Sequence, residues 1–294
     1  MADFRPVTAA VKAYAAACVK EALAAPVTTT PPPTTVSTGV QPFPTHPVGL
    51  YHMCWSNSGS PLVGTTPANV NVLYLAFAQG DPPSLVGNAS DGASFGTELK
   101  KLRARGVRII ASVGGQGGAI NISNQDAFVN GIAAISTSLC PLDGLDFDLE
   151  GPAMGQTDVL AVATKLKSKL GTNFAITMAP NGSNIGTYLP IAKALYSKGL
   201  LAGFGQQFYD APVSTSAMMG RIDEFVGTGI PASKYSVGMM IASDSSHWTN
   251  AQCVTNYKAA KAKYPSIGGA YLWEASRPGC AQWATEVGTL VKAG

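Results

Sequence analysis

The sequence predicts an α/β protein built around one (β/α)8 TIM barrel, and three observations lead to this fold class. The chain has 294 residues, 46% of them hydrophobic, which suits a barrel of about 250 residues with a large core. From Val48 onward, short apolar runs alternate with stretches of helical spacing, as expected of parallel strands covered by helices. Polar and aromatic residues gather where the expected strands end, the face at which such barrels carry chemistry.

The expected elements follow one another in strict alternation. Apolar runs predict strands at residues 48-55, 70-78, 108-115, 144-151, 174-181, 204-210, 235-242 and 268-275. Helical spacing predicts helices at about 95-106, 124-140, 155-171, 188-201, 216-230, 249-263 and 278-292. The connections after the second and seventh strands are short, so we expect no large inserted α+β subdomain. The cleft should therefore be open and shallow.

A doubly wound open sheet is the alternative fold. Its best support is the glycine-rich stretch Gly114-Gly115-Gln116-Gly117-Gly118. No acidic residue follows about 20 positions later to mark a dinucleotide site. The barrel is therefore favoured.

The first 47 residues differ from the rest of the chain. Residues 1-25 form an expected helical segment, in which Val7, Val11, Tyr14 and Cys18 give the helix at 7-25 a narrow apolar seam. Residues 26-47 contain seven Pro, seven Thr and no Asp, Glu, Lys or Arg, which is typical of an extended linker. The barrel domain is expected at 48-294. Because an isolated helix is marginal in water, residues 7-25 are expected to bind an assembly partner or further copies of the chain.

Charge and hydropathy exclude several classes of partner. The net charge of +3 does not indicate nucleic-acid binding, and no apolar run is long enough to span a membrane. The opening Met1-Ala2-Asp3-Phe4-Arg5-Pro6 lacks the basic start of a secretory signal. With no convincing signal peptide, we expect extracellular or virion-associated action through attachment to a larger particle.

The cysteines do not predict a metal site. Cys18, Cys54, Cys140, Cys253 and Cys280 form no C-x-x-C pair and have no histidines at zinc spacing. Cys253 and Cys280 each fall at the start of a helix in neighbouring barrel units, so we expect them to be close or bridged by a disulfide. No cofactor is expected.

The run Asp143-Gly144-Leu145-Asp146-Phe147-Asp148-Leu149-Glu150 carries the chemistry. Alternate side chains of a strand share a face, so its last three acids should project together while Leu and Phe pack on the other side. Like charges this close should raise the pKa of at least one carboxyl, and Glu150 is the natural candidate for a general acid. A metal site or a solvated acidic edge is the alternative, but calcium ligands usually come from flexible loops.

Other strand ends supply further polar and aromatic groups. Met178, Ala179, Pro180 and Asn181 end the fifth strand, Gln207, Tyr209 and Asp210 the sixth, and Trp273 and Glu274 the eighth. A fully packed structural core would not place them so consistently. They are the candidates for the walls of a site around Glu150.

The acidic run matches the D-G-x-D-x-D-x-E signature of glycoside hydrolase family 18, which contains chitinases and endo-β-N-acetylglucosaminidases, and Ser112-Val113-Gly114-Gly115 resembles the family's S-x-G-G strand. Gln207-Phe208-Tyr209 is similar to its Q-x-Y motif, and Trp273 and Tyr51 are similar to an eighth-strand tryptophan and a first-strand tyrosine. The resemblance covers residues 48 to 290. It implies a TIM barrel that cleaves β-1,4 bonds next to N-acetylglucosamine.

The resemblance also implies roles for the residues. Glu150 would protonate the glycosidic oxygen while the substrate's own acetamido oxygen attacks the anomeric carbon. Asp148 would orient the acetamido group, with Asp146 behind it, and Tyr209 would donate to the acetamido oxygen. The substrate-binding wall would comprise Trp273, Gln207, Met178, Tyr51 and Phe77.

Some of these assignments have an equally good structural explanation. Tyr51, Phe77 and Met178 could be barrel core, and Ser112 and its glycines could simply shape the end of the third strand. Trp55, Trp248 and Trp283 suit either a groove or packing. The substrate could be chitin, peptidoglycan strands or N-glycan cores. A non-catalytic glycan-binding protein, or a structural or adhesion head of a larger assembly such as a phage virion, is the alternative function.

Overall fold

The structure is a computed structural model, and it describes residues 39–55, 66–85, 92–116, 120, 122, 124–148, 150, 155–182, 185–209, 213–242, 244 and 246–293. These residues belong to a compact unit, Val36–Gly294. The expected helix at 7-25 and the linker up to residue 38 lie outside the described residues. The assembly role of residues 7-25 therefore stays a prediction.

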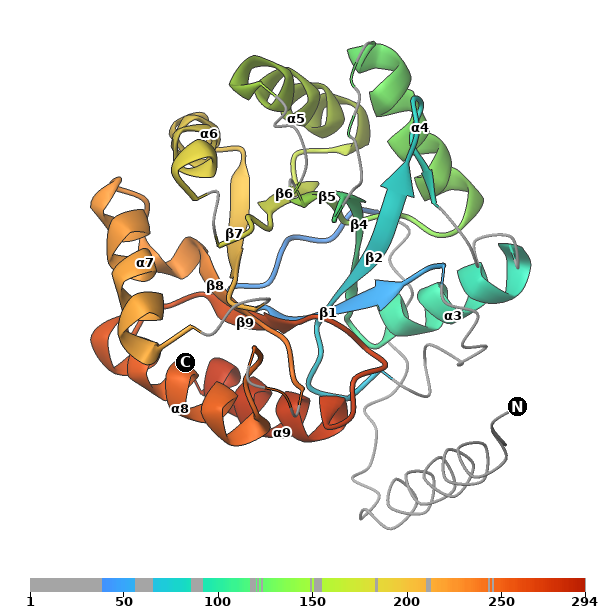
Figure 1. The fold of residues 1–294 in the computed structure, drawn as a ribbon. Coiled ribbons are helices and arrows are strands. Elements are labelled where there is room, and N and C mark those ends of the chain that lie inside the picture. The colour runs from blue at the N-terminus through green and yellow to red at the C-terminus, as the bar shows by residue number, and fades with distance from the viewer. Residues whose placement is uncertain are drawn as a thin grey trace, which may run out of the picture. The chain divides into compact units, whose positions relative to one another are not determined.

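Eight parallel strands close into a barrel, which confirms the predicted fold (Figure 1). The hydrogen-bonded order is β1-β9-β8-β7-β6-β5-β4-β2, and parallel pairing of β1 with β2 closes the ring. A short strand, β3, adds an antiparallel hairpin to β2 that the sequence did not predict. The strands are β1 Val48–Met53, β2 Val72–Gln79, β3 Ser84–Leu85, β4 Arg108–Gly114, β5 Gly144–Asp148, β6 Ala175–Met178, β7 Leu201–Gln207, β8 Tyr235–Met239 and β9 Gly269–Leu272.

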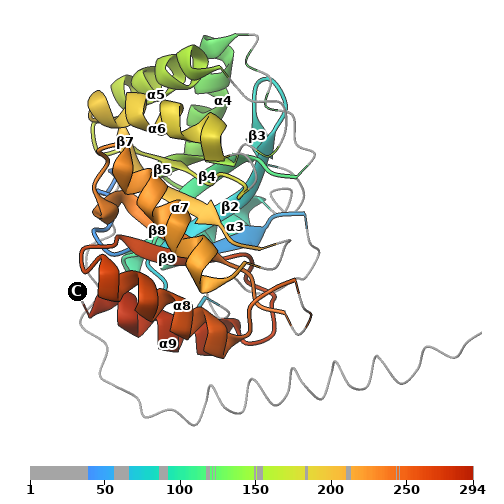
Figure 2. The same ribbon diagram turned by 60° about the vertical axis from the view of Figure 1, so that its left-hand side comes forward.

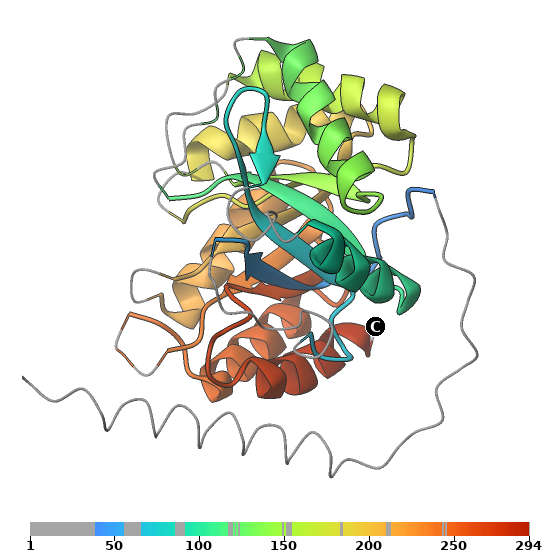
Figure 3. The same cartoon turned by 90° about the vertical axis from the view of Figure 1, so that its right-hand side faces the viewer.

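Helices surround the ring of strands (Figures 2 and 3). The α-helices are α3 Gly92–Ala104, α4 Gln125–Ser138, α5 Gln156–Leu170, α6 Ile185–Ser197, α7 Thr215–Gly227, α8 Asn250–Lys263 and α9 Cys280–Lys292, with a short 3-10 helix at Ala232–Lys234. Within these described elements no helix has the length and apolar character needed to cross a membrane.

One strand and one helix begin earlier in the chain than the sequence predicted. The helix expected at 188-201 is α6, which ends at Ser197, and the strand expected at 204-210 is β7, which begins at Leu201. Gly199 has a φ of +67°, a left-handed conformation that ends a helix. Leu200 and Leu201 are thereby released from the helix and start the strand.

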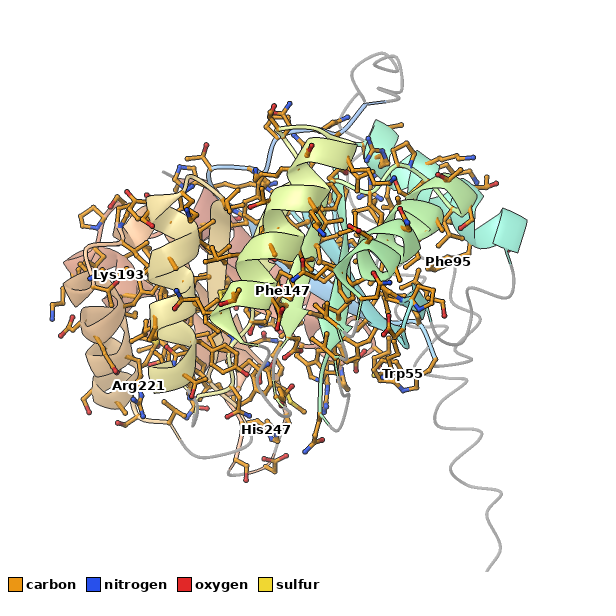
Figure 4. The ribbon with its side chains drawn as sticks, turned by 90° about the horizontal axis from the view of Figure 1, so that it is seen from above. Trp55, Phe95, Phe147, Lys193, Arg221 and His247 are labelled. Atoms are coloured by element: carbon orange, nitrogen blue, oxygen red, sulfur yellow. The ribbon has the colours of Figure 1, made fainter. Side chains whose placement is uncertain are left out.

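Two apolar layers flank the barrel wall. Leu145 and Phe147 point outward into the layer between strands and helices, and Figure 4 shows Phe147 behind the helices that cover it. Tyr51, Tyr74 and Tyr271 fill the interior, where the first two rings stack with centroids 4.5 Å apart. These large side chains make the barrel a packed core rather than a pore.

Glycines in two neighbouring strands make room for Tyr271. A Cβ atom at Gly205 would lie 2.5 Å from Tyr271 Cε1, and one at Gly238 would overlap the same ring. The Tyr271 hydroxyl donates to the Gly205 carbonyl at 3.0 Å. The absence of side chains at these positions therefore allows a full tyrosine inside the barrel.

Residues 39–47, which we assigned to the linker, lie against the amino-terminal end of the barrel. Arg103 and Asp143 form an ion pair at 2.5 Å in which each side chain is 1% exposed. Arg103 Nη2 also donates to the Gly39 carbonyl at 2.8 Å, and the Gln41 amide donates to Asp143 Oδ1 at 2.9 Å. Phe43 packs against the interior cluster. This part of the segment contributes to the core because a buried charge pair and an aromatic ring hold it.

Replacing Arg103 with Met should lower the free energy of unfolding by about 3–5 kcal/mol, because Asp143 would be left as a buried charge without its partner. Urea denaturation measures the change. Lys101→Met is the matched control, since the exposed pair of Lys101 with Glu98 should contribute about 1 kcal/mol or less. Equal losses in the two variants would show that the buried pair does not anchor the segment.

Candidate active site

The acidic run adopts the predicted alternation. Asp146 and Asp148 on β5 are buried inside the barrel, 1% and 2% exposed, while Leu145 and Phe147 pack in the outer layer. Glu150 lies just beyond the end of the strand, half-buried at the wall of a cavity. The three acids thus run from the closed interior to the accessible end of the barrel.

Asp146 lies at the centre of a hydrogen-bond network that joins four strands. Its Oδ2 accepts from the hydroxyls of Tyr51 at 2.9 Å and Ser112 at 2.8 Å, and its Oδ1 accepts from Thr177 at 2.6 Å. In the strand register, Ser112 is paired with Asp146 and Asp146 with Thr177. Neighbouring parallel strands therefore bring these side chains to one level of the barrel interior.

Gln207 connects the other two acids. Its Nε2 lies 2.9 Å from Asp148 Oδ1, 3.4 Å from Glu150 Oε1 and 3.2 Å from the Ala179 carbonyl. Asn181, at the end of β6, donates to Glu150 Oε2 at 3.4 Å. The general-acid candidate is thus oriented by two side-chain amides from adjacent strands.

The expected rise in pKa falls on the acids inside the barrel. Burial, followed by the charges of Glu150 and Asp146, raises the pKa of Asp148 well above its usual range. Burial also raises the pKa of Asp146, although its three hydroxyl donors oppose the shift. At least one carboxyl of the run therefore has a raised pKa, as the close spacing of the acids predicted, and Asp148 is the clearest case.

A cavity of about 560 Å³ opens in front of Glu150. Aromatic rings form one wall, where Trp273 and Phe77 stack with centroids 5.7 Å apart and Phe77 stacks on Trp55 at the same distance. Trp55 is 43% exposed, and Figure 4 shows it at one end of the barrel. The described lining residues are Trp55, Phe77, Gln79, Gln116, Glu150, Tyr209, Met240, Trp273 and Arg277.

The glycine-rich end of β4 supports the acids from behind. The Gly115 amide donates to the Asp148 carbonyl at 2.8 Å. Gly114 has a φ of +103°, and a Cβ atom on it would overlap that carbonyl. These glycines shape the strand end, while the neighbouring Ser112 contacts Asp146 rather than the cavity.

The predicted wall residues divide into two groups. Phe77, Tyr209 and Trp273 line the cavity, whereas Tyr51 and Gln207 lie beneath it and hold the acids. The roles assigned to these residues stay predictions.

Met178 was predicted to contact substrate, and its position is different. It is fully buried in the outer layer between strands and helices. Thr177, its neighbour on β6, points inward to Asp146 instead, because alternate residues of a strand face opposite sides.

Other expectations are also corrected. Cys253 and Cys280 are buried free thiols, as are Cys54 and Cys140, so the expected disulfide is wrong. For the tryptophans that the sequence left open, the structure makes Trp248 and Trp283 buried packing residues and places Trp55 on the cavity. Asp210 lies outside the described residues.

Sequence reasoning missed several residues at the site. Thr177 could have been found from its two-residue offset from Ala175 and its level beside Asp146. Asn181 had been noted only as a polar strand end. Gln79 is the last residue of β2, whereas Met240 and Arg277 follow β8 and β9 in loops whose course no sequence pattern predicts. Over the described part of the chain, no group of three or more His, Cys, Asp or Glu side chains is arranged to hold a metal ion.

Comparison with known sequences finds chitinases. No model of a protein family matches the chain. It is 26% identical over 214 residues to a probable class II chitinase of Arthroderma benhamiae, covering 57% of this chain and 63% of that protein. It is 27% identical over 225 residues to exochitinase 1 of Streptomyces olivaceoviridis, covering 55% and 37%. The chain thus spans less than two thirds of these relatives' length.

Solved structures with the same barrel include enzymes and an agglutinin. A fungal endo-β-N-acetylglucosaminidase from glycosyl hydrolase family 18 matches with a TM-score of 0.69 and 21% identity, over 84% of this chain and 99% of that one. A chitinase-like agglutinin from Robinia pseudoacacia matches with a TM-score of 0.62 and 18% identity, over 82% and 98%. At these identities, the matches show the shared fold.

Asp148→Asn should make the protein more stable near neutral pH. A raised folded-state pKa means that folding takes up a proton between the unfolded and folded values, so stability falls as pH rises through this window. Asparagine removes this penalty, and its carbonyl can still accept from Gln207. Thermal unfolding from pH 4 to 9 should show a loss of stability in the wild type and a flatter profile in the variant. An Asp126→Asn control, changed at an exposed site on α4, should follow the wild type, and an equally steep decline in Asp148→Asn would contradict the assignment.

Proposed function

We propose that the chain is a member of glycoside hydrolase family 18, as its similarity to chitinases supports, and that it hydrolyses β-1,4 bonds next to N-acetylglucosamine in chitin-like or peptidoglycan-like glycans. The observation that carries the proposal is Glu150 at the cavity wall, with Asp148 directly behind it and Gln207 within hydrogen-bond reach of both. A carboxyl group in contact with a sugar-sized cavity can deliver a proton to a leaving oxygen.

Glu150 is the general acid in this reaction. It protonates the glycosidic oxygen as the bond to the anomeric carbon breaks, and the substrate's 2-acetamido oxygen forms a new bond to that carbon. The product of this step is an oxazolinium ion. Glu150, now a carboxylate, then takes a proton from the water that opens the ring, so both the proton and the bond balance over the cycle.

Asp148 stabilises the positive intermediate and orients the acetamido N–H. Its raised pKa means that burial disfavours its negative charge in the empty site, and a positive charge that forms nearby would offset this cost. Three hydroxyl donors hold Asp146 in place. Its carboxyl lies deeper in the barrel than Asp148 and influences the charge of Asp148. Tyr209, which lines the cavity, donates its hydroxyl to the acetamido oxygen.

Trp273 provides an apolar floor for the sugar ring, and Phe77 and Trp55 extend this surface outward. The centroids of these three rings lie within 6.4 Å of one another, so the rings form one compact aromatic patch that supports stacking of a sugar ring. Residues 240–249 alone connect β8 to α8, which leaves no space for a domain-sized insertion at that side. An open cleft of this kind favours cleavage within a chain.

Glycan binding without hydrolysis is the second candidate. The chitinase-like agglutinin among the structural matches supports it, because a barrel can keep its cleft without catalysis. The presence of Glu150, Asp148 and Tyr209 together favours the enzyme.

Glu150→Gln should reduce hydrolysis of a fluorogenic chitobioside by about 10²- to 10⁴-fold, since the amide cannot donate the proton. Binding of chitotetraose, measured by calorimetry, should change little because the side-chain shape is kept. Glu286→Gln, on the exposed side of α9, is the matched control and should retain full activity. If Glu150→Gln kept most of its turnover, the catalytic assignment would be wrong.

Hydrolysis should require the acetamido group and retain the anomeric configuration. Two displacements at one carbon restore the starting stereochemistry, so NMR of early products should show the β anomer first. Fully deacetylated chitosan should not be cleaved, and a chelator should leave the rate unchanged. Initial release of the α anomer would exclude this mechanism.

A further inference from the structure

Arg277 lies where the active-site cavity meets a second cavity. It lines the cavity of about 560 Å³ in front of Glu150 and also a neighbouring one of about 400 Å³. The second cavity has a largely uncharged lining, with described residues Ile241, Ala242, Thr249, Asn250 and Pro278 beside the arginine. Among the described residues that line either cavity, Arg277 is the one cation.

The guanidinium of Arg277 is poorly satisfied by the protein. Its Nε lies 3.5 Å from Glu274 Oε1 without forming a hydrogen bond. Its Nη2 lies 3.7 Å from the sulfur of Met240, which is a weak acceptor. Because a guanidinium carries five N–H donors and this side chain is 30% exposed, donors remain available to a ligand.

Glu274 is the ion-pair partner of Arg277 but does not use all of the arginine's hydrogen-bond donors. Both carboxylate oxygens of Glu274 already accept from Ser276, at 2.8 Å from its amide and 2.7 Å from its hydroxyl. Glu274 is 4% exposed, so its charge lies behind the arginine rather than in the cavity. The Arg277 guanidinium therefore lies between a buried carboxylate and the two cavities that it lines.

We propose that Arg277 binds a carboxylate on the glycan, so that the substrate is an N-acetylated amino-sugar chain in which a neighbouring sugar is acidic. This inference rests on the proposed function of the same site. A planar guanidinium matches a carboxylate through two parallel hydrogen bonds, whereas neutral hydroxyls can be served by the amides of Gln79 and Gln116 on the same cavity. The carboxylate can come from an ether-linked lactic acid or from a uronic acid.

Binding to the Glu150→Gln protein tests the proposal without hydrolysis. The probes are chitotetraose, a tetrasaccharide that alternates N-acetylglucosamine with N-acetylmuramic acid, and a hyaluronan tetrasaccharide, each measured by calorimetry at low and high salt. We expect one acidic probe to bind more tightly than chitotetraose at low salt and to lose this advantage at high salt. The acidic probe that does so identifies the source of the carboxylate.

In the Glu150→Gln protein, the further substitution Arg277→Gln should weaken binding of that acidic probe about tenfold, the order expected for loss of a charge-assisted hydrogen bond. Binding of chitotetraose should change little. Arg277→Lys keeps the charge and should retain part of the salt-dependent preference. Arg221→Gln is the control, since Arg221 lies on α7 away from the cavity (Figure 4) and pairs with Glu224.

Two results would overturn the proposal. Equal weakening of acidic and neutral probes by Arg277→Gln would show that the arginine serves hydroxyls, and tighter binding of chitotetraose than of both acidic probes would show that no carboxylate is recognised. Failure of the proposed function would instead appear as an absence of hydrolysis of every acetamido glycan by the unmodified protein.

Discussion

The carboxylate of Asp146 and its three hydroxyl donors are the constraint on which the site depends. Tyr51, Ser112 and Thr177 reach it from three other strands, so a shift of any one strand would leave a buried donor or acceptor without a partner. Such a group costs about 1–3 kcal/mol. The register of half the barrel is therefore tied to one side chain, and that register sets the level at which Asp148 and Glu150 follow on β5.

The buried cluster of acids lowers the stability of the folded protein. Asp148 is buried near two other acids, and its raised pKa reports an unfavourable environment for its charge. A core designed only to fold would not contain this cluster, whereas a site that must stabilise a positive intermediate needs it. The hydroxyl donors around Asp146 and the amide of Gln207 limit the cost, and apolar layers on both sides of the strands supply the stability that the cluster lacks.

The sequence predicted the barrel and the inward acids because both follow from simple periodicity. Alternation over eight units predicts the ring of strands, and a two-residue period places Asp146 and Asp148 on one face. Met178 was misplaced because its strand carries apolar residues on both sides, so composition alone could not decide which face points inward. Arg277 was missed because a loop residue has no period, and the packing of Phe43 was missed because composition suggested only a linker. These positions depend on tertiary contacts between distant segments.

The hydrogen bonds of Gln207 bear on which ligands the cavity can accept. Its Nε2 has two hydrogens, but three acceptors lie within reach: Asp148, Glu150 and the Ala179 carbonyl. Its own Oε1 is buried without a partner. Two N–H groups therefore face three acceptors, so at least one acceptor does not receive a full hydrogen bond from Gln207. A ligand N–H that reached one of these acceptors would relieve this shortage, which supports the proposed preference for a glycan that carries an acetamido group.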